Sequence, residues 1–290
     1  MRDLKGKVAF ITGGASGIGL AMAQAFGRAG MSVMIADIER SALNRAVDEL
    51  RASQVRADGV IADVASRDSL RGAALETIAK FGKVHVVCNN AGVGAGGPIG
   101  EVAEQDWSWI LGVNLMGVVH GVEIFTPLIA GHGEGGHFVN TASIAGMISP
   151  PGMEPYNATK FAVVAMSEGW AGQLAPMNIG VSVLCPGFVK TRIHESRRNR
   201  PGGAGDADEA SNTSAAFVLG GIAPQAVGER VVEAVRDGEL YVFTHPEFRA
   251  PVAARFDAIL AAFDHAAESP ALKGLPARDL PSMLVPGAGD

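Results

Sequence analysis

The feature that most constrains the fold is a regular alternation of short β-branched runs with helical patterns of roughly ten to twenty residues. This alternation is typical of βαβ units, in which helices join parallel strands and cover the sheet. Strands are predicted at residues 8–12, 32–36, 58–63, 84–89, 137–141, 181–185 and 240–243, and helices at 18–28, 41–51, 68–81, 104–129, 156–174 and 225–236. The sequence therefore predicts an α/β fold with one doubly wound, seven-stranded parallel sheet and helices on both faces.

Two segments interrupt this alternation. Residues 194–222 are too long and polar for a simple connection, and such loops commonly cover a binding site. The segment from Ser269 onward contains four prolines, so it cannot form a continuous helix and is expected to lie extended on a neighbouring surface. We expect a single catalytic domain over residues 1–263, with a variable substrate lid at 190–222, followed by a Pro-rich tail at 264–290.

Charge and cysteine content exclude several classes of protein. A net charge of −6 disfavours binding to a nucleic-acid backbone. The longest uncharged stretch, residues 169–189, contains Pro176 and Pro186 and is predicted to be a helix end, a turn and a strand rather than a membrane span. Charged residues at the start leave no room for a secretory signal, so we expect a cytoplasmic protein with no membrane partner. Cys88 and Cys185 lie in apolar runs and are expected to be buried thiols.

A glycine-rich turn follows the first predicted strand. The strand at 8–12 leads directly into Gly13-Gly-Ala-Ser-Gly-Ile-Gly19 and then into a helical pattern. Glycines let backbone N–H groups approach a pyrophosphate, and the helix dipole places about half a positive charge at that point. The spacing differs from G-x-G-x-x-G, and a purely structural turn remains an alternative interpretation.

Asp37 strengthens the dinucleotide interpretation. It ends the second apolar strand, where an acidic residue would bind the ribose 2′-hydroxyl. Its carboxylate would repel the additional phosphate of NADP, and Ile38 supplies no compensating positive charge, so NAD is the favoured cofactor. Arg40 could reach a 2′-phosphate, although a solvated arginine at a helix start is the simpler interpretation.

Tyr156 and Lys160 stand at i and i+4 in a predicted helix, so their side chains share one face. A free tyrosine has a pKa near ~10 and is a poor base at neutral pH, but a nearby ammonium and a cationic nicotinamide would stabilise the phenolate. Taken alone, such a pair is commonly an ordinary surface pair. Its significance depends on the other motifs.

Together these motifs resemble the short-chain dehydrogenase/reductase family, a Rossmann-fold family, over residues 4 to about 263. Thr12-Gly13-x-x-x-Gly17-x-Gly19 resembles the cofactor turn, Asp63-Val64 the adenine-contacting pair, Asn89-Asn90-Ala91-Gly92 the central-strand motif, and Pro186-Gly187 with Thr191 the segment that holds the nicotinamide carboxamide. The resemblance implies a cofactor site formed by Gly13, Ser16, Gly17, Ile18, Gly19, Asp37, Ile38, Asp63, Val64, Asn90, Ala91, Gly92, Tyr156, Lys160, Pro186, Gly187, Val189 and Thr191.

The resemblance also implies a catalytic tetrad of Asn114, Ser143, Tyr156 and Lys160. Tyr156 would take the hydroxyl proton while hydride passes to nicotinamide C4, and Ser143 would hold the substrate oxygen. Lys160 would lower the pKa of Tyr156 and bind the nicotinamide ribose. Asn114 would anchor a water that relays the proton to solvent.

Residues at the expected substrate positions are apolar: Val93, Gly94, Met147, Ile148, Met153, Phe188, Ile193 and Phe217. They suit a hydrophobic or aromatic secondary alcohol or ketone, although each could instead be a core residue. Four arginines at the start of the lid, Arg192, Arg197, Arg198 and Arg200, could clamp an anionic group or could simply be solvated. Residues 195–201 and 240–247 are similar to a branch that contains dehydrogenases of lignin-derived benzylic alcohols.

The sequence thus predicts an NAD-dependent oxidoreductase acting on a CH–OH group. The competing enzyme is a 3-oxoacyl-thioester reductase of the same fold, and a minor alternative is a non-catalytic, dinucleotide-responsive binding protein. The resemblance implies a homodimer or homotetramer built on the helices at 104–129 and 156–174. The histidines show no metal-ligand spacing, so no metal is expected.

Overall fold

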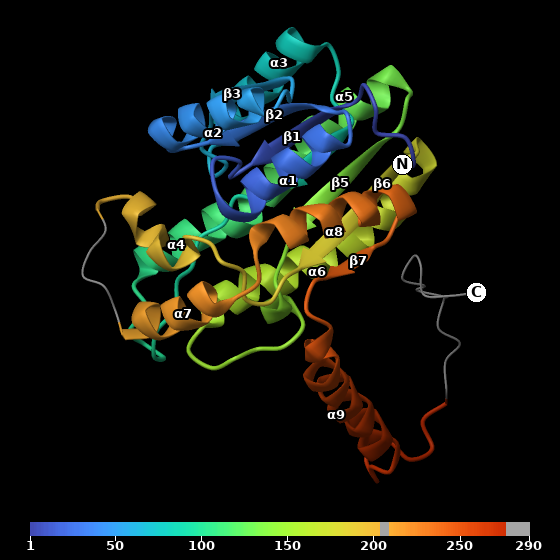
Figure 1. The fold of residues 1–290 in the computed structure, drawn as a ribbon. Helices are drawn as coiled ribbons and strands as arrows, with labels where there is room; N and C mark the ends of the chain where they lie inside the picture. Colours follow the sequence, from blue (N-terminus) through green and yellow to red (C-terminus); the bar gives the residue numbers. More distant parts are fainter. Residues whose placement is uncertain (204–208, 277–290) are drawn as a thin grey trace.

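The computed structural model describes residues 1–203 and 209–276. Its centre is an all-parallel sheet of seven strands in the order β3-β2-β1-β4-β5-β6-β7, with helices on both faces (Figure 1). The strands are β1 (Val8–Thr12), β2 (Ser32–Asp37), β3 (Ala57–Ile61), β4 (Val86–Asn89), β5 (Gly136–Thr141), β6 (Ile179–Cys185) and β7 (Tyr241–Phe243). The predicted α/β class and doubly wound sheet are confirmed.

The α-helices of the described residues are α1 (Gly17–Arg28), α2 (Arg40–Ala52), α3 (Arg67–Phe81), α4 (Glu104–Ile110), α5 (Gly117–His132), α6 (Glu154–Leu174), α7 (Glu209–Gly220), α8 (Pro224–Asp237) and α9 (Arg249–Ala267). A π-helix, η1 (Leu111–Met116), joins α4 to α5. Short 3₁₀ helices include η2 (Ile144–Gly146), η3 (Ala175–Met177), η4 (Ile193–Asn199) and η5 (Pro246–Phe248).

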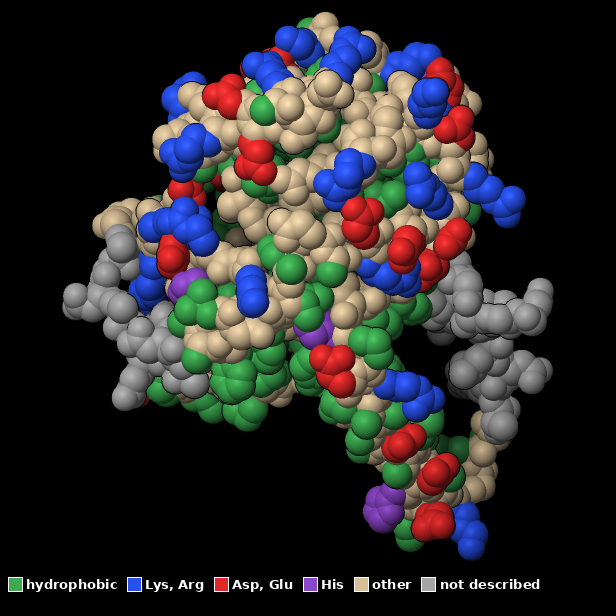
Figure 2. Space-filling model, viewed as in Figure 1, with side chains coloured by type: hydrophobic (Ala, Val, Ile, Leu, Met, Phe, Trp, Pro, Cys, Tyr) green, Lys and Arg blue, Asp and Glu red, His purple; other side chains and the backbone are tan. Residues whose placement is uncertain are grey.

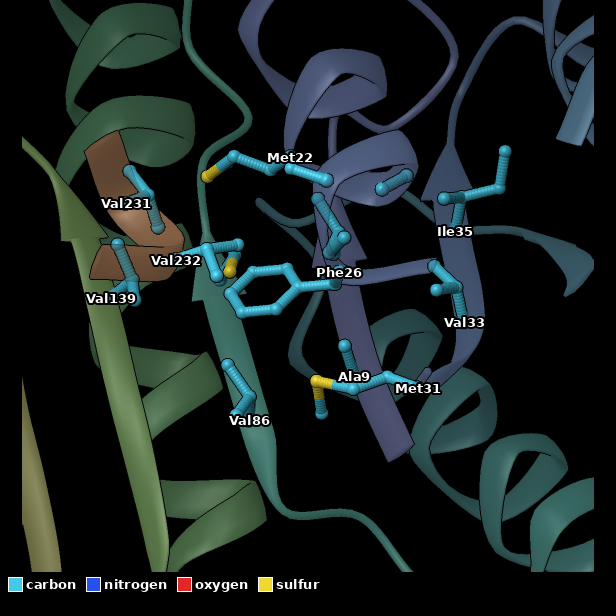
Figure 3. Close-up of a cluster of buried hydrophobic side chains, with 14 of the residues drawn as sticks. Ala9, Met22, Phe26, Met31, Val33, Ile35, Val86, Val139, Val231 and Val232 are labelled. Carbon is cyan, nitrogen blue, oxygen red and sulfur yellow. The ribbon is translucent and has the colours of Figure 1, made fainter. Parts of the chain in front are cut away.

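Two hydrophobic clusters hold the helices against the sheet. On one face, α1, α2 and α8 pack on the central strands, with Phe26 fully buried among Met22, Val86 and Val231 (Figure 3). On the other face, α3 and α5 pack around Phe10 and Phe125, whose ring centroids lie 4.6 Å apart. Because both faces are covered, β1 and β2 are almost continuously apolar rather than alternating.

The structure corrects three details of the predicted elements. The helix predicted at 104–129 is a run of α4, η1 and α5 that widens around Asn114. No helix was predicted at α7 or at α9, and α9 continues to Ala267, past the expected domain boundary at 263. The prediction for the Pro-rich tail falls largely on residues 277–290, which lie outside the described residues.

The run Glu104–His132 is the described segment that is long and apolar enough to cross a membrane, with a mean hydropathy of 1.5. Half of its most apolar window is buried within the structure, and Phe125 and Ile129 belong to the second hydrophobic cluster. The stretch at 169–189, in contrast, forms the end of α6, then η3 and β6, as predicted. The run Glu104–His132 is therefore part of the protein core.

Candidate active site

The predicted site residues gather at the carboxyl ends of the parallel strands. The chain connects β1 outward to β2 and β3, and then crosses back to β4, so the strand order reverses between β1 and β4. In open α/β sheets, ligands bind at such a reversal, just beyond the carboxyl ends of the strands. The glycine turn follows β1 there, and the Asn89-Asn90-Ala91-Gly92 motif follows β4.

The glycine turn leaves an open space that side chains at its glycine positions would fill. Gly13 and Gly17 have φ angles of +63° and +53°, which favour glycine. A Cβ atom on Gly19 would lie 2.1 Å from the carbonyl oxygen of Gly13. Ser16, the N-cap residue of α1, makes no side-chain capping bond, and Ile18 follows in the first turn. The N–H groups at the start of α1 therefore lack a side-chain cap and fit a pyrophosphate.

Asp37 ties this turn to the end of β2. One carboxylate oxygen accepts the Ala15 N–H at 3.1 Å, and the other accepts the Glu39 N–H at 3.0 Å. The neighbouring Ile38 side chain is 49% exposed. The Asp37 carboxylate is thus fixed beside the glycine turn, where the adenosine ribose of a dinucleotide would lie.

Thr12 locks the ends of β1 and β4 together. Its hydroxyl donates to the Cys88 carbonyl and accepts the N–H groups of Asn90 and Ala91 at 2.9 and 3.0 Å. The Asn90 side chain donates to the Thr12 carbonyl at 3.0 Å. A Cβ atom on Gly92 would lie 3.7 Å from the Lys160 Nζ, so this motif reaches the tetrad. The sequence places Thr12 at the start of the turn motif but does not indicate that its hydroxyl joins the two strand ends.

The predicted adenine-contacting pair, Asp63 and Val64, lies just after β3. Asp63 accepts the Ala65 N–H at 2.9 Å and donates its own N–H to Ser69. Val64 is buried, and its carbonyl accepts a hydrogen bond from His120 at 3.0 Å. These bonds hold the loop after β3 at the same edge of the sheet as the glycine turn.

The predicted catalytic side chains come together above β5. Ser143 caps η2 and accepts the Ala145 N–H at 3.1 Å, while its hydroxyl donates to the Pro186 carbonyl at 3.4 Å. Lys160 donates to the Thr141 carbonyl at 2.9 Å, and its Nζ lies 5.4 Å from the centroid of the Tyr156 ring. A hydrogen bond also joins Ser143 to Tyr156. The helical i, i+4 spacing therefore places the phenol and the ammonium on one face, as predicted.

Burial dominates the electrostatics of this group. It raises the pKa of the Tyr156 phenol, and the hydrogen bond from Ser143 lowers that pKa to a smaller extent. Burial lowers the pKa of Lys160 to about 8, against a smaller opposing effect from Cys185. Desolvation is the larger of the two effects on Tyr156, and the lowering of its pKa by Lys160 stays a prediction.

Asn114 lies in the π-helix η1, and its side chain is bound to a backbone segment. Its Oδ1 accepts the Val93 N–H at 2.8 Å, and its Nδ2 donates to the Val93 carbonyl at 2.9 Å. Single-turn π segments are frequent at functional sites. The amide thereby fixes the loop after β4, and its hydrogen-bonding capacity is largely used by Val93.

The segment after β6 closes the site from the other side. A Cβ atom on Gly17 would lie 3.0 Å from the Thr191 side chain, so Thr191 lies against the glycine turn. The Gly187 N–H donates to Nδ1 of His245, whose Nε2 bonds the Phe188 carbonyl at 3.0 Å. Val189 is buried and bridges to Ile222. His245, 58 positions from Gly187, supports this segment and was not predicted.

The expected substrate residues divide into two groups. Val93 and Met147 are buried in hydrophobic clusters, so the core interpretation holds for both. Phe188 and Phe217 are 42% and 57% exposed, and their rings stack at 5.1 Å. Gly94, Ile148, Met153 and Ile193 are half-buried. Hydrophobic side chains gather over α7 and along α9, below the sheet (Figure 2).

One cluster of possible metal ligands lies at the opposite edge of the sheet. His85, His132 and Glu134 hold ligand atoms within 4.8 Å of one another. His85 accepts the Val8 N–H and contacts Glu134 through its other nitrogen. His132 bonds the Val84 carbonyl and accepts the Glu134 N–H. All four ring nitrogens are engaged, so this cluster does not suit a metal ion.

Comparison with known proteins defines the class. A family model described as short chain dehydrogenase matches residues 7–202. The chain belongs to the short-chain dehydrogenase/reductase family, whose members are oxidoreductases that use a nicotinamide dinucleotide on small alcohols and ketones.

Individual relatives span most of the chain. It is 40% identical to a short chain dehydrogenase/reductase from Burkholderia phymatum solved in complex with NAD, with a TM-score of 0.87 and coverage of 90% of this chain and 97% of that one. It is 36% identical to a C alpha-dehydrogenase from Sphingobium sp., covering 90% of this chain and 87% of the relative. It is 34% identical to a 3-oxoacyl-[acyl-carrier-protein] reductase from Thermotoga maritima, covering 66% and 78%.

Proposed function

We propose that this protein is an NAD-dependent oxidoreductase that transfers a hydride between nicotinamide and the carbinol carbon of a hydrophobic or aromatic secondary alcohol or ketone. The observation that carries the proposal is the grouping of buried Ser143 and Lys160 with the partly buried Tyr156 at the carboxyl ends of the strands. Asn114 completes this group by fixing the Val93 loop.

The nicotinamide, when bound, supplies the carbon that accepts or donates the hydride. Tyr156 exchanges the proton with the substrate oxygen, acting as base in oxidation and as acid in reduction. Its raised pKa keeps the phenol protonated in the structure, which suits proton donation to a developing alkoxide. Ser143 positions the same oxygen through its hydroxyl.

Lys160 and Asn114 complete the proton path. Lys160 is held by the Thr141 carbonyl, and with a pKa of about 8 it exchanges protons near neutral pH. It would also bind the nicotinamide ribose. Because the Asn114 amide is bound to Val93, a relay water at this position would contact the backbone of η1 rather than the amide itself.

Asp37 supports NAD as the cofactor. Its carboxylate is fixed beside the turn by the N–H groups of Ala15 and Glu39, where it would accept bonds from ribose hydroxyls and repel a 2′-phosphate. Ile38 offers no cation. The Burkholderia relative was solved with NAD bound, and the match covers 97% of that chain. The remaining proposed contacts come from the turn, Asp63, Val64, the Asn90 motif and the Pro186–Thr191 segment.

A 3-oxoacyl-thioester reductase is the competing function, and the Thermotoga reductase is the observation that favours it. That match covers 66% of this chain, whereas the C alpha-dehydrogenase match covers 90% of it. The exposed Phe188 and Phe217 pair at the lid favours an apolar or aromatic substrate.

We propose a homodimer or homotetramer, for which the sedimentation mass is the test.

The test is the initial rate of NADH or NADPH formation across aliphatic, benzylic, steroid and hydroxyacyl alcohols. We expect turnover with NAD on bulky apolar secondary alcohols. Preference for NADP with hydroxyacyl thioesters would instead establish the reductase. Dinucleotide binding without turnover on any alcohol or ketone would identify a binding protein.

A further inference from the structure

The start of the lid is attached to the cofactor loop by an ion pair that no motif predicts. Arg198 in η4 donates from Nε and Nη2 to one oxygen of Glu39, at 2.9 and 2.6 Å. Asn199 donates to the same oxygen at 3.0 Å. Glu39 precedes α2 and follows Asp37 by two residues, so a lid residue reaches the loop that holds the adenosine ribose.

This ion pair lies directly against the Asp37 carboxylate. The Glu39 N–H donates to Asp37 Oδ1, so the residue that holds Arg198 is itself bound to the proposed ribose ligand. Arg198 is held further by the Arg192 carbonyl, which its Nη1 reaches at 3.2 Å. Both side chains of the pair are about three-quarters buried, with exposed fractions of 28% for Arg198 and 24% for Glu39.

Arg198 neutralises one of the two acidic groups of this loop. Asp37 and Glu39 are those acidic groups, Arg40 follows Glu39 in the chain, and Arg198 is the cation that the lid adds. Arg192 is occupied by Glu195, at 2.6 Å. The hydrogen bond from Arg198 keeps the pKa of Glu39 below its usual value, so Glu39 is ionised at neutral pH. A guanidinium that is already bound to a carboxylate is a poor ligand for an incoming phosphate.

We propose that Glu39 is a second determinant of cofactor choice, which excludes a 2′-phosphorylated dinucleotide by keeping Arg198 engaged. Asp37 repels the phosphate directly, whereas Glu39 withholds the arginine that could bind it. This inference rests on the proposed NAD preference. It makes the lid, and not the β2 loop alone, part of the dinucleotide specificity.

Two single variants are expected to shift specificity in opposite directions. Glu39→Gln removes the charge that holds Arg198, so NADPH should bind about fivefold more tightly while NADH binding changes little. Arg198→Met leaves the charge of Glu39 without its cation beside Asp37, so NADPH should bind more weakly than it binds to the wild type. The double variant should return close to the wild-type ratio, because neither the free arginine nor the unpaired carboxylate is present.

The dissociation constants of NADH and NADPH are measured by isothermal titration calorimetry, without substrate, on the full chain. Arg200→Met is the matched control. It removes a lid arginine whose partner is Asp106 on α4, and it should leave the ratio of the two constants unchanged. Circular dichroism confirms that each variant is folded.

The inference is overturned if Glu39→Gln leaves the NADPH to NADH ratio unchanged, or if Glu39→Gln and Arg198→Met shift it in the same direction. The second result would mean that the pair acts only by holding the lid in place. Wild-type preference for NADPH would contradict the proposed NAD function. The direction of the two shifts would still test the roles of Glu39 and Arg198.

Discussion

The glycine turn and the lid face each other across the same site but are specified in different ways. The turn is held by hydrogen bonds that backbone N–H groups donate at the strand ends, such as Asn90 to Thr12 across 78 positions and Ala15 to Asp37 across 22. The lid is held by ion pairs to distant positions: Arg198 to Glu39 spans 159 positions and Arg200 to Asp106 spans 94. The glycine turn therefore depends on a short motif in which side chains would not fit. The lid depends on ion pairs between charged residues far apart in the chain.

The largest effect expected on cofactor binding comes from a substitution in the glycine turn. In Gly19→Ala, the new Cβ would lie 2.1 Å from the Gly13 carbonyl oxygen and 2.7 Å from Asn90 Nδ2. The turn must move, and we expect dinucleotide affinity to fall about a hundredfold, the upper end of the penalty for overpacking. Calorimetric titration with NADH measures this loss.

Gly72→Ala on α3 is the matched control, because its Cβ would meet nothing within 4 Å. It should bind NADH as the wild type does. Equal affinity in Gly19→Ala and Gly72→Ala would show that the tight turn is not needed for binding.

A second steric prediction tests the core beneath the site. In Gly121→Ala on α5, the Cβ would lie 1.9 Å from the Asn89 Oδ1, whose amide bonds buried Asn140 at 2.9 Å. We expect the free energy of unfolding to fall by about 2–3 kcal/mol. Urea denaturation measures it, with Gly131→Ala as control, since nothing lies within 4 Å of that position. A stability loss equal to that of the control would refute the close contact.

The charge-paired side is tested by Asp106→Asn. Asp106 is 6% exposed and accepts a bond from Arg200, with Arg197 at 3.8 Å. Removing its charge should loosen the lid and raise the substrate KM about fivefold, while NADH binding changes little. Asp68→Asn is the control, because its 91% exposed side chain pairs only along α3 with Arg71. A change in NADH affinity as large as the change in KM would show that the lid and the glycine turn are coupled, and would contradict the contrast drawn between them.

The smallest expected effect is a pH dependence of stability. Burial lowers the pKa of Lys160 to about 8, whereas in the unfolded chain it is near 10.5. Between these values the unfolded chain binds more protons than the folded one, so this group makes stability rise with pH from about 8 to 10.5. The urea midpoint of unfolding should therefore rise more between pH 7.5 and pH 9.5 in the wild type than in Lys160→Met. Identical pH dependence in both proteins would contradict the buried ammonium.

The sequence predicted the elements whose signal is local. β1 begins and ends at the predicted residues, and the glycine turn and Asp37 lie where a dinucleotide needs them. Helical spacing alone placed Tyr156 beside Lys160. These features follow from short motifs whose residue types and spacing can be read directly from a single sequence.

Features set by distant partners were not predicted. The π-helix around Asn114 depends on the bond to Val93, and the lid arginines on Glu39 and Asp106. Helix α9 carries an apolar stripe at helical spacing that includes Phe256 and Phe263, but these side chains are 48% and 70% exposed. Its Pro251 stands in the first turn, where a helix tolerates proline. The direction of the Tyr156 pKa also depended on burial, which motif spacing does not reveal.

The most direct test of the central claim compares the two tyrosines of the chain. Tyr156→Phe removes the hydroxyl proposed to exchange the proton with the substrate, whereas Tyr241→Phe removes a hydroxyl that bonds Glu168 on the surface of α6. We expect Tyr156→Phe to lower kcat on a bulky secondary alcohol at least about a thousandfold, with NADH binding nearly unchanged, and Tyr241→Phe to remain active. Substantial turnover by Tyr156→Phe would contradict the assignment of this site.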